Sequence, residues 1–316
     1  MNKTLINGDK WLDSNGNIIH AHGGHILYKD GYYYWYGENR LDNNYVSCYR
    51  SKDLMNWEFR NNILTTKSKA EAIRVRTKLN LLSKTGKKVN LERPKVIYNV
   101  KTKKYVLWVH YENGEDYCEA AAAIATCDTP DGDFTYHGSF NPYGYMSRDC
   151  TLFKDDDGTA YFISASRNNA DMHIYRLADD YMNVDCLVNK LWQGEYREAP
   201  AVVKKDNTYY MLSSFCTGWD PNQGKYSSAT SMTGKWRMLE DIGDETTFDT
   251  QPAFILTIFG EKENEYVYVA DRWDGDNYHN SRYVFLKLIF EDDKKISMKY
   301  CDEFKIDLKN TKFIEI

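Results

Sequence analysis

Three carboxylates stand at equivalent places in a repeated pattern. Glu92, Asp149 and Glu198 lie in the short polar strings LERPK, SRDCT and YREAPA, each followed by a predicted strand. A fourth string, DTQPA, offers Gln251, and a fifth, HAHGG (20–24), offers histidines and no acid. Acids gathered in a dry pocket repel one another, so at least one should hold its proton near neutral pH. A protonated carboxyl beside a group that activates water is what glycoside hydrolysis requires.

A simpler interpretation pairs each acid with the arginine beside it in the chain, namely Arg93, Arg148 and Arg197. Such an ion pair would only fix a turn. For one acid alone this is the more common arrangement, but three acids at equivalent repeat positions favour a shared pocket.

The strings recur because the chain repeats one unit. Each unit opens with an apolar strand, a polar turn and an aromatic-rich strand, over 25–38, 95–112, 151–166, 201–215 and 254–273. A weaker strand pair follows each hairpin, over 46–59, 121–136, 172–184, 226–239 and 281–300. Two hairpins per unit predict an all-β fold, a five-bladed β-propeller with four antiparallel strands per blade, as one domain over 1–316. The first strand of each blade lines the channel, so the strings should meet at one end.

One segment interrupts the repeat between the first two blades. Residues 61–90 are rich in lysine and arginine and carry spaced aliphatic residues, which is typical of a basic amphipathic helix over part of the segment. We expect a solvated insertion on the rim of the propeller. A lid that contacts a polymer or another subunit is the alternative.

The amino-acid composition indicates which class of ligand the protein binds. The net charge of −5 argues against a nucleic-acid partner, whereas 26 Tyr and 8 Trp supply surfaces that stack on flat ligands such as sugar rings. No apolar run is long enough to span a membrane. The N-terminus lacks the apolar stretch of a secretory signal, so we expect a cytoplasmic protein, or a secreted one if a signal has been removed.

The 7 cysteines have no C-x-x-C pair and indicate reduced thiols, with Cys150 and Cys216 as weak candidates for catalysis.

No metal site is predicted. His20, His22 and His25 are close in sequence, but alternation along a strand sends neighbours to opposite faces and no acid completes a zinc set. The string DDDG (155–158) resembles the start of a calcium loop, yet it lies in a hairpin turn and lacks the downstream glutamate.

Seven motifs taken together resemble glycoside hydrolase family 43, and within it the branch of exo-β-1,3-galactanases, also called galactan 1,3-β-galactosidases. The resemblance covers about residues 7 to 290. The motifs, in chain order, are AHGGHILYKDGYYYWYGEN (21–39), ERPKVIYN (92–99), SRDCTLF (147–153), YREAPA (196–201), TGWDPN (217–222), TQPAF (250–254) and DRWDGDNYHNSRYVFLKL (271–288).

The resemblance implies a five-bladed propeller that inverts the anomeric centre. Glu198 matches the family's general acid, and Asp149 matches the acidic residue that tunes its pKa. Most of the family places an aspartate base before the first inner strand, where this chain has HAHGG and no carboxylate. The branch carries Glu92 and Gln251 instead. Either Glu92 deprotonates the water, or Gln251 holds the water and its amide relays the proton through the imidic tautomer. The branch pattern favours Gln251 on the water side, with Glu92 as a ligand of a sugar hydroxyl.

The same motifs imply the residues of the sugar pocket. A glutamate at the end of the first hairpin would bind adjacent hydroxyls, and a stacking floor is expected from tryptophans or from one of Tyr33 to Tyr36. The implied substrate-binding residues are Glu38, Tyr117, Asn169, Thr217, Asp220, Trp219 and Trp273. No cofactor is implied, although some family members hold a calcium ion in the channel, and a structural calcium ion is left open here.

The leading hypothesis is therefore exo-acting, inverting removal of terminal β-1,3-linked galactose from galactan or galacto-oligosaccharides. One alternative keeps the family and changes the sugar, as an α-L-arabinofuranosidase or a β-xylosidase. Another is a propeller that binds glycans without cleaving them, given the missing aspartate. The expected partner is an oligosaccharide or polysaccharide, acted on by a monomer or a weak oligomer.

Overall fold

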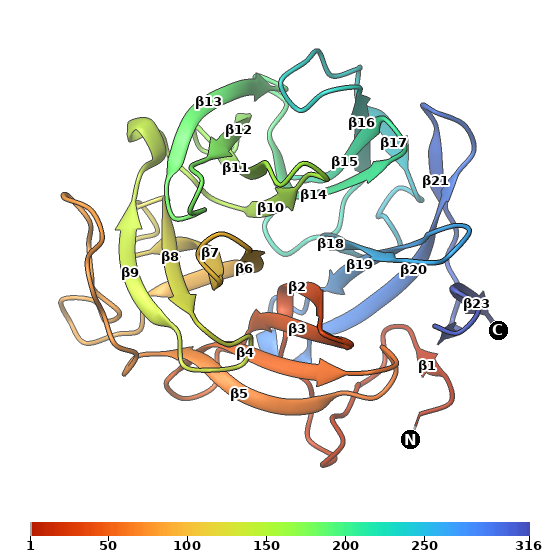
Figure 1. The fold of residues 1–316 in the computed structure, drawn as a ribbon, viewed down its shortest axis with the longest axis horizontal. Coiled ribbons are helices and arrows are strands. Elements are labelled where there is room, and N and C mark those ends of the chain that lie inside the picture. The colour runs from red at the N-terminus through yellow and green to blue at the C-terminus, as the bar shows by residue number, and fades with distance from the viewer. Residues whose placement is uncertain (1) are drawn as a thin grey trace.

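The computed structural model describes residues 2–316, and its strands form antiparallel sheets arranged around a central axis (Figure 1). Five sheets have four strands each, in chain order. The first sheet contains β2 (His22–Lys29), β3 (Tyr32–Glu38), β4 (Asn44–Ser51) and β5 (Glu58–Thr65), and the second contains β6 (Asn90–Asn99), β7 (Lys104–Glu112), β8 (Ala121–Cys127) and β9 (Thr135–Phe140). The third contains β10 (Cys150–Lys154), β11 (Ala160–Ser166), β12 (Asp171–Leu177) and β13 (Val184–Leu191). The fourth contains β14 (Arg197–Lys205), β15 (Thr208–Phe215), β16 (Gly224–Ala229) and β17 (Glu240–Ile242), and the fifth contains β18 (Gln251–Ile258), β19 (Glu265–Arg272), β20 (Arg282–Phe290) and β21 (Ile296–Met298).

The prediction of five blades is wrong, because the strands form six sheets. The sixth contains three strands, so four strands per blade also fails for it: β1 (Leu5–Ile6), β22 (Glu303–Asp307) and β23 (Lys312–Glu315). It joins the two ends of the chain, with Leu5 opposite Phe304. The repeat gave no sign of this sheet because β1 is far from its partners in sequence and lacks the hairpin pattern.

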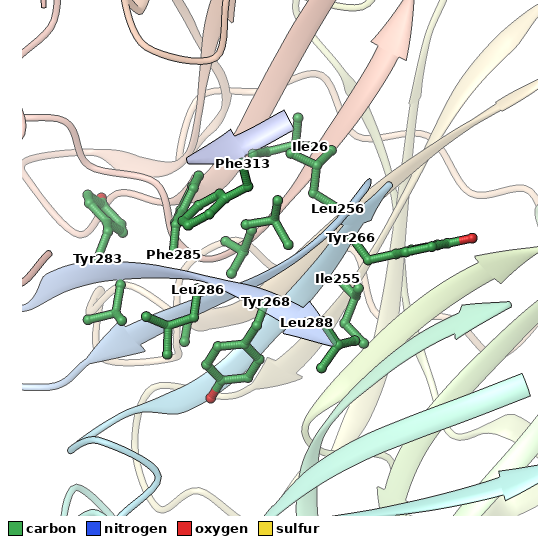
Figure 2. Close-up of a cluster of buried hydrophobic side chains, with 14 of the residues drawn as sticks. Ile26, Ile255, Leu256, Tyr266, Tyr268, Tyr283, Phe285, Leu286, Leu288 and Phe313 are labelled. Carbon is green, nitrogen blue, oxygen red and sulfur yellow. The ribbon is translucent and has the colours of Figure 1, made fainter. Parts of the chain in front are cut away.

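The sixth sheet is fastened to the fifth by aromatic rings. Phe304 stacks on Phe285 of β20 and on Phe313 of β23, with ring centroids 5.9 and 4.8 Å apart. Figure 2 shows Phe313 beside Phe285 in a cluster that also holds Leu286 and Tyr268 from neighbouring strands. Offset aromatic pairs of this kind add roughly 0.5–1.5 kcal/mol each beyond the burial of their area. The chain ends therefore stabilise the sheet next to which they lie.

The first strands of the four-stranded sheets bring the polar strings together. In chain order β2, β6, β10, β14 and β18 contact one another, and β18 returns to contact β2. Residues at or just before the N-terminal ends of β6, β10, β14 and β18 line one common pocket, so these ends lie at the same end of the channel. Residues far apart in sequence thus meet at that end.

The helix predicted within 61–90 is wrong. Residues 61–65 belong to β5, residue 90 opens β6, and the described chain between them has no helix. This intervening stretch instead pairs along the outer strand β9, where Lys78 exchanges backbone hydrogen bonds with Ser139 at 3.0 and 2.9 Å. It covers an edge that would otherwise expose unpaired backbone groups.

Helical structure within residues 2–316 is limited to two short 3₁₀ turns, Pro142–Gly144 and Tyr278–Asn280. Neither these nor any other described segment forms a helix of the length and apolarity that crossing a bilayer demands.

Candidate active site

Irregularities in the inner strands turn the site residues toward the channel end. The pairing register shifts after His22 in β2, after Glu92 in β6 and after Glu198 in β14. The residues that follow them, Gly23, Arg93 and Ala199, all have positive φ, at 58°, 59° and 51°. Such a conformation costs a residue with a side chain roughly 1–2 kcal/mol. A bulge re-aims the side chain before it, so the repeat places comparable side chains alike.

These side chains open into a pocket of about 390 Å³ at the channel mouth. Nine of the eleven predicted site residues line it: Glu38, Glu92, Tyr117, Asp149, Asn169, Glu198, Trp219, Gln251 and Trp273. The carboxylates come from three sheets and from the strand ends beside them. The pocket is therefore built by the ring as a whole and not by any one hairpin.

Two predicted substrate-binding residues, Thr217 and Asp220, do not line this pocket. The Thr217 hydroxyl donates to the backbone oxygen of Asp220 at 2.6 Å, which closes the turn that carries Trp219. Gly218 and Trp219 of the same motif line the pocket, whereas this hydrogen bond between Thr217 and Asp220 shapes the turn. Residues Tyr33 to Tyr36, offered as a stacking floor, are buried between the sheets and do not reach the pocket.

The sequence did not identify six further pocket residues as ligands: Arg40, Asn90, Arg93, Arg148, Cys216 and Gly218. Two of them pair with the acids. Arg93 Nε lies 3.1 Å from Asp149, and Arg40 binds both Glu38 at 2.8 Å and Glu92 at 3.2 Å. The pairing of each acid with its sequence neighbour is therefore wrong. Arg93 stands next to Glu92 in the motif ERPK, but nothing local shows that it reaches the next sheet.

Glu198 has the environment of a proton donor. It is 9% exposed, and burial together with the charge of Asp149 raises its pKa to about 7, against the opposing effects of Arg93 and of a hydrogen bond from Gln251. Asn169 Nδ2 donates to Glu198 Oε2 at 3.1 Å, and Gln251 Nε2 donates to Oε1 at 2.9 Å. The two amides hold the carboxyl group in one orientation while burial favours its neutral form.

Gln251 is held at both ends of its amide. Its Oε1 accepts hydrogen bonds from Arg93 and from Trp273 Nε1, the latter at 2.8 Å. Its Nε2 also donates to Ser214 Oγ at 2.9 Å. With two donors on the oxygen, this side chain has no free acceptor for the proton of an imidic tautomer.

Glu92 is ionised. Burial alone would raise its pKa, but His110, whose Nδ1 lies 3.4 Å from the carboxylate, and the charge of Arg40 lower it well below its usual range. His110 is fully buried, with Glu112 on its other ring nitrogen at 3.1 Å. Although burial opposes it, contact with Glu112 and Glu92 raises the pKa of His110 to about 9. A protonated histidine therefore stands between two carboxylates.

One cluster among the described residues has the composition of a metal site: Glu92, His110 and Asp149, with ligand atoms within 4.8 Å of one another. It does not fit a calcium ion, which takes six to eight oxygen ligands. Arg40 and Arg93 already occupy the two carboxylates, and His110 is protonated at neutral pH. The charge of a cation is already supplied by these side chains. The histidines close together in the sequence, His20, His22 and His25, are not part of this cluster. His22 Nδ1 instead lies 2.9 Å from Asp271.

A propeller whose channel mouth gathers a buried carboxyl of raised pKa, further acidic residues and tryptophans has the site of a glycosidase. The sequence profile of the glycosyl hydrolases family 43 matches residues 20–286, and the chain belongs to this family. Glycosidases of this family generally act without a cofactor. A comparison with curated proteins finds no match.

Solved structures place the chain within the family. It is similar to an exo-β-1,3-galactanase from Clostridium thermocellum, with 43% identity, a TM-score of 0.91, and coverage of 99% of this chain and 68% of the other. It is also similar to an exo-β-1,3-galactanase from Phanerochaete chrysosporium solved with β-1,3-galactotriose, with 34% identity, a TM-score of 0.87, and coverage of 100% and 71%. An endo-1,4-β-xylanase from Bacteroides thetaiotaomicron, with 18% identity, a TM-score of 0.65 and coverage of 93% and 96%, shares the fold alone.

The raised pKa of Glu198 predicts the alkaline limb of the pH profile. Because the protonated form is needed to donate, kcat/KM should fall as pH rises through about 7. Asp149→Asn removes a charge that raises this pKa, so the midpoint should move to lower pH. The measurement is kcat/KM against pH for both proteins, at constant ionic strength.

Asp206→Asn serves as the control, because it makes the same change of charge at an exposed residue outside the pocket. The midpoint of the pH profile should be the same as in the wild-type protein. An alkaline limb near pH 4.5, or a limb that Asp149→Asn does not move, would contradict this account of Glu198.

Proposed function

We propose that the protein is an exo-acting, inverting glycosidase that removes terminal β-1,3-linked galactose from galactan or galacto-oligosaccharides. The observation that carries the chemistry is Glu198, a buried carboxyl whose pKa is raised to about 7 beside Asp149 in the pocket at the channel mouth. The likeness to two exo-β-1,3-galactanases, at 43% and 34% identity, supports the choice of sugar and linkage.

In the proposed mechanism Glu198 protonates the leaving oxygen. Asp149 keeps the pKa of Glu198 high in the free enzyme, and its own pair with Arg93 fixes its orientation. Glu38, 2% exposed at the end of β3, accepts from Arg40 and Tyr278 and would take hydrogen bonds from adjacent sugar hydroxyls. These contacts orient the ring so that the anomeric bond lies next to the acid.

The aromatic residues have separate tasks in this proposal. Trp219 is 45% exposed and packs edge-on against Trp273 at 5.5 Å, so its open face suits a sugar ring at the pocket mouth. Trp273 is committed at its indole nitrogen to Gln251. It would contact substrate only through its ring face.

We assign the water-side role to Gln251 and a hydroxyl-binding role to Glu92. The carboxylate of Glu92 already accepts from Arg40, Asn90 and Tyr117, and its lowered pKa makes it a weak base. Gln251 lies beside Glu198, and it would orient the attacking water by exchanging its hydrogen bond to Ser214 Oγ for one to that water, whose proton passes on to solvent. Because its Oε1 is saturated, the imidic relay is not part of this proposal.

The substrate test compares β-1,3-galactobiose with nitrophenyl arabinofuranoside and nitrophenyl xyloside. The wild-type protein should release galactose from the first, with α-galactose as the first product by ¹H NMR because inversion converts a β-linkage. Glu198→Gln should lose turnover by about 10³-fold while galactose binding by calorimetry stays within about tenfold.

Hydrolysis of the pentosides alone would make the protein an arabinofuranosidase or xylosidase. Binding of galactan by the wild-type protein with no sugar released would establish a glycan-binding propeller.

Azide rescue tests which side chain faces the water. In Gln251→Ala a small anion can fill the vacated space and attack the same face, so azide should restore turnover of an activated galactoside and give the α-galactosyl azide. Glu92→Ala, the matched truncation, should not be rescued. Rescue of Glu92→Ala alone would reverse the assignment and make Glu92 the base.

We further propose that catalysis needs no calcium ion, because arginines and a protonated histidine occupy the acids of the cluster. Dialysis against EDTA should leave kcat/KM on β-1,3-galactobiose within about twofold and the thermal midpoint unchanged, since a bound ion would stabilise the folded state. Loss of activity on chelation, restored by calcium, would contradict the proposal.

A further inference from the structure

The segment between β5 and β6, residues 66–89, contacts both loops that carry side chains to one wall of the pocket. We call it the brace segment. One loop joins β3 to β4 and carries Arg40. The other joins β7 to β8 and carries Tyr117.

Lys88 fastens the first loop. Its Nζ donates to three backbone oxygens, those of Arg40 at 3.2 Å, Asp42 at 3.0 Å and Asn44 at 2.6 Å. An ammonium group has three donors, so all of them close on this one loop. Nζ also lies 5.1 Å from the ring of Tyr45. The backbone from Arg40 to Asn44 is thereby tied to the residues just before β6.

The second loop is held by the residues around Lys88. The Thr85 hydroxyl donates to Glu115, and Lys87 lies 3.5 Å from the same carboxylate. Gly114 passes so close that a Cβ there would stand 2.2 Å from the backbone oxygen of Lys88. Only glycine allows this approach, at a φ of 77°. The brace segment thus contacts both loops within a few residues.

The side chains of Arg40 and Tyr117, one from each loop, contact the carboxylates of the pocket wall. Arg40 binds Glu38 of one sheet and Glu92 of the next, and its guanidinium lies 4.1 Å from the ring of Tyr278. The Tyr117 hydroxyl donates to Glu92. A shift of the Arg40 backbone would therefore disturb two carboxylates at once.

We propose that Lys88 is a positioning residue for Arg40, and that the brace segment sets the shape of the pocket wall formed by Glu38 and Glu92. The inference rests on the proposed function, because it assigns that wall to the binding of sugar hydroxyls. Lys88 does not reach the pocket lining, so its effect passes through Arg40. Its loss should weaken substrate binding more than it slows the chemical step.

The test is Lys88→Met, which keeps an unbranched stem and removes the three donors. KM for β-1,3-galactobiose should rise about tenfold with kcat changing less than about threefold, because binding is lost in the ground state and transition state alike. Galactose inhibition should weaken by about the same factor. Lys84→Met, an exposed lysine of the same segment, is the matched control and should behave as wild type. Lys88→Gln, which keeps two donors on a shorter stem, should lie between wild type and Lys88→Met and serves as the second variant if Lys88→Met folds poorly.

A double-mutant cycle separates this from a general loss of stability. Since Lys88 acts through Arg40, adding Lys88→Met to Arg40→Ala should raise KM no further. Additive effects, or a Lys88→Met protein indistinguishable from Lys84→Met, would overturn the proposal.

A crystal structure of Lys88→Met gives a readout that does not depend on the substrate. The Arg40 guanidinium should leave Glu38, and an unmoved Arg40 would overturn the inference. Wild-type protein that does not cleave β-1,3-galactobiose would instead refute the proposed function and leave this structural result standing.

Discussion

The buried guanidinium of Arg93 is the interaction on which the site depends. It pairs with Asp149, donates to Gln251 and to the backbone oxygen of Pro252, and so joins β6 to the sheets on either side of the pocket. Burial works against its charge, but the acids around it, Asp149 foremost, raise its pKa. Without this cation the neighbouring carboxylates would be buried and uncompensated, which is far more costly than an exposed pair.

The same charge explains how acids in one pocket take different protonation states. Asp149 is paired with Arg93, and Glu92 is paired with Arg40 and His110, whereas Glu198 is held by the neutral amides of Asn169 and Gln251. A neutral donor stabilises a carboxylate less than a cation does. The cations thus pair with Asp149 and Glu92, whereas Glu198 has neutral partners and the raised pKa of a proton donor.

The sheets repeat the same backbone geometry near the pocket, but the side chains that each sheet places there have different partners. Bulges after His22, Glu92 and Glu198 place three side chains alike, but their partners differ from sheet to sheet. His22 binds Asp271 and takes no place in the pocket. Below the site, the buried Lys95 donates to the backbone oxygen of Gly23 at 2.6 Å and ties β6 to β2. This hydrogen bond joins two inner strands of neighbouring sheets below the pocket.

The sequence by itself determined the hairpin repeat, the all-β class and the strings that carry Glu92, Asp149, Glu198 and Gln251, because period-two alternation and turn residues are local signals. Tertiary structure decided what such signals cannot contain. The sixth sheet depends on pairing between the two chain ends, Arg93 and Arg40 find their partners on other sheets, and Thr217 and Asp220 turn away to close their own loop. A strand pattern states which residues share a face, but the partner across a ring depends on closure of the whole chain.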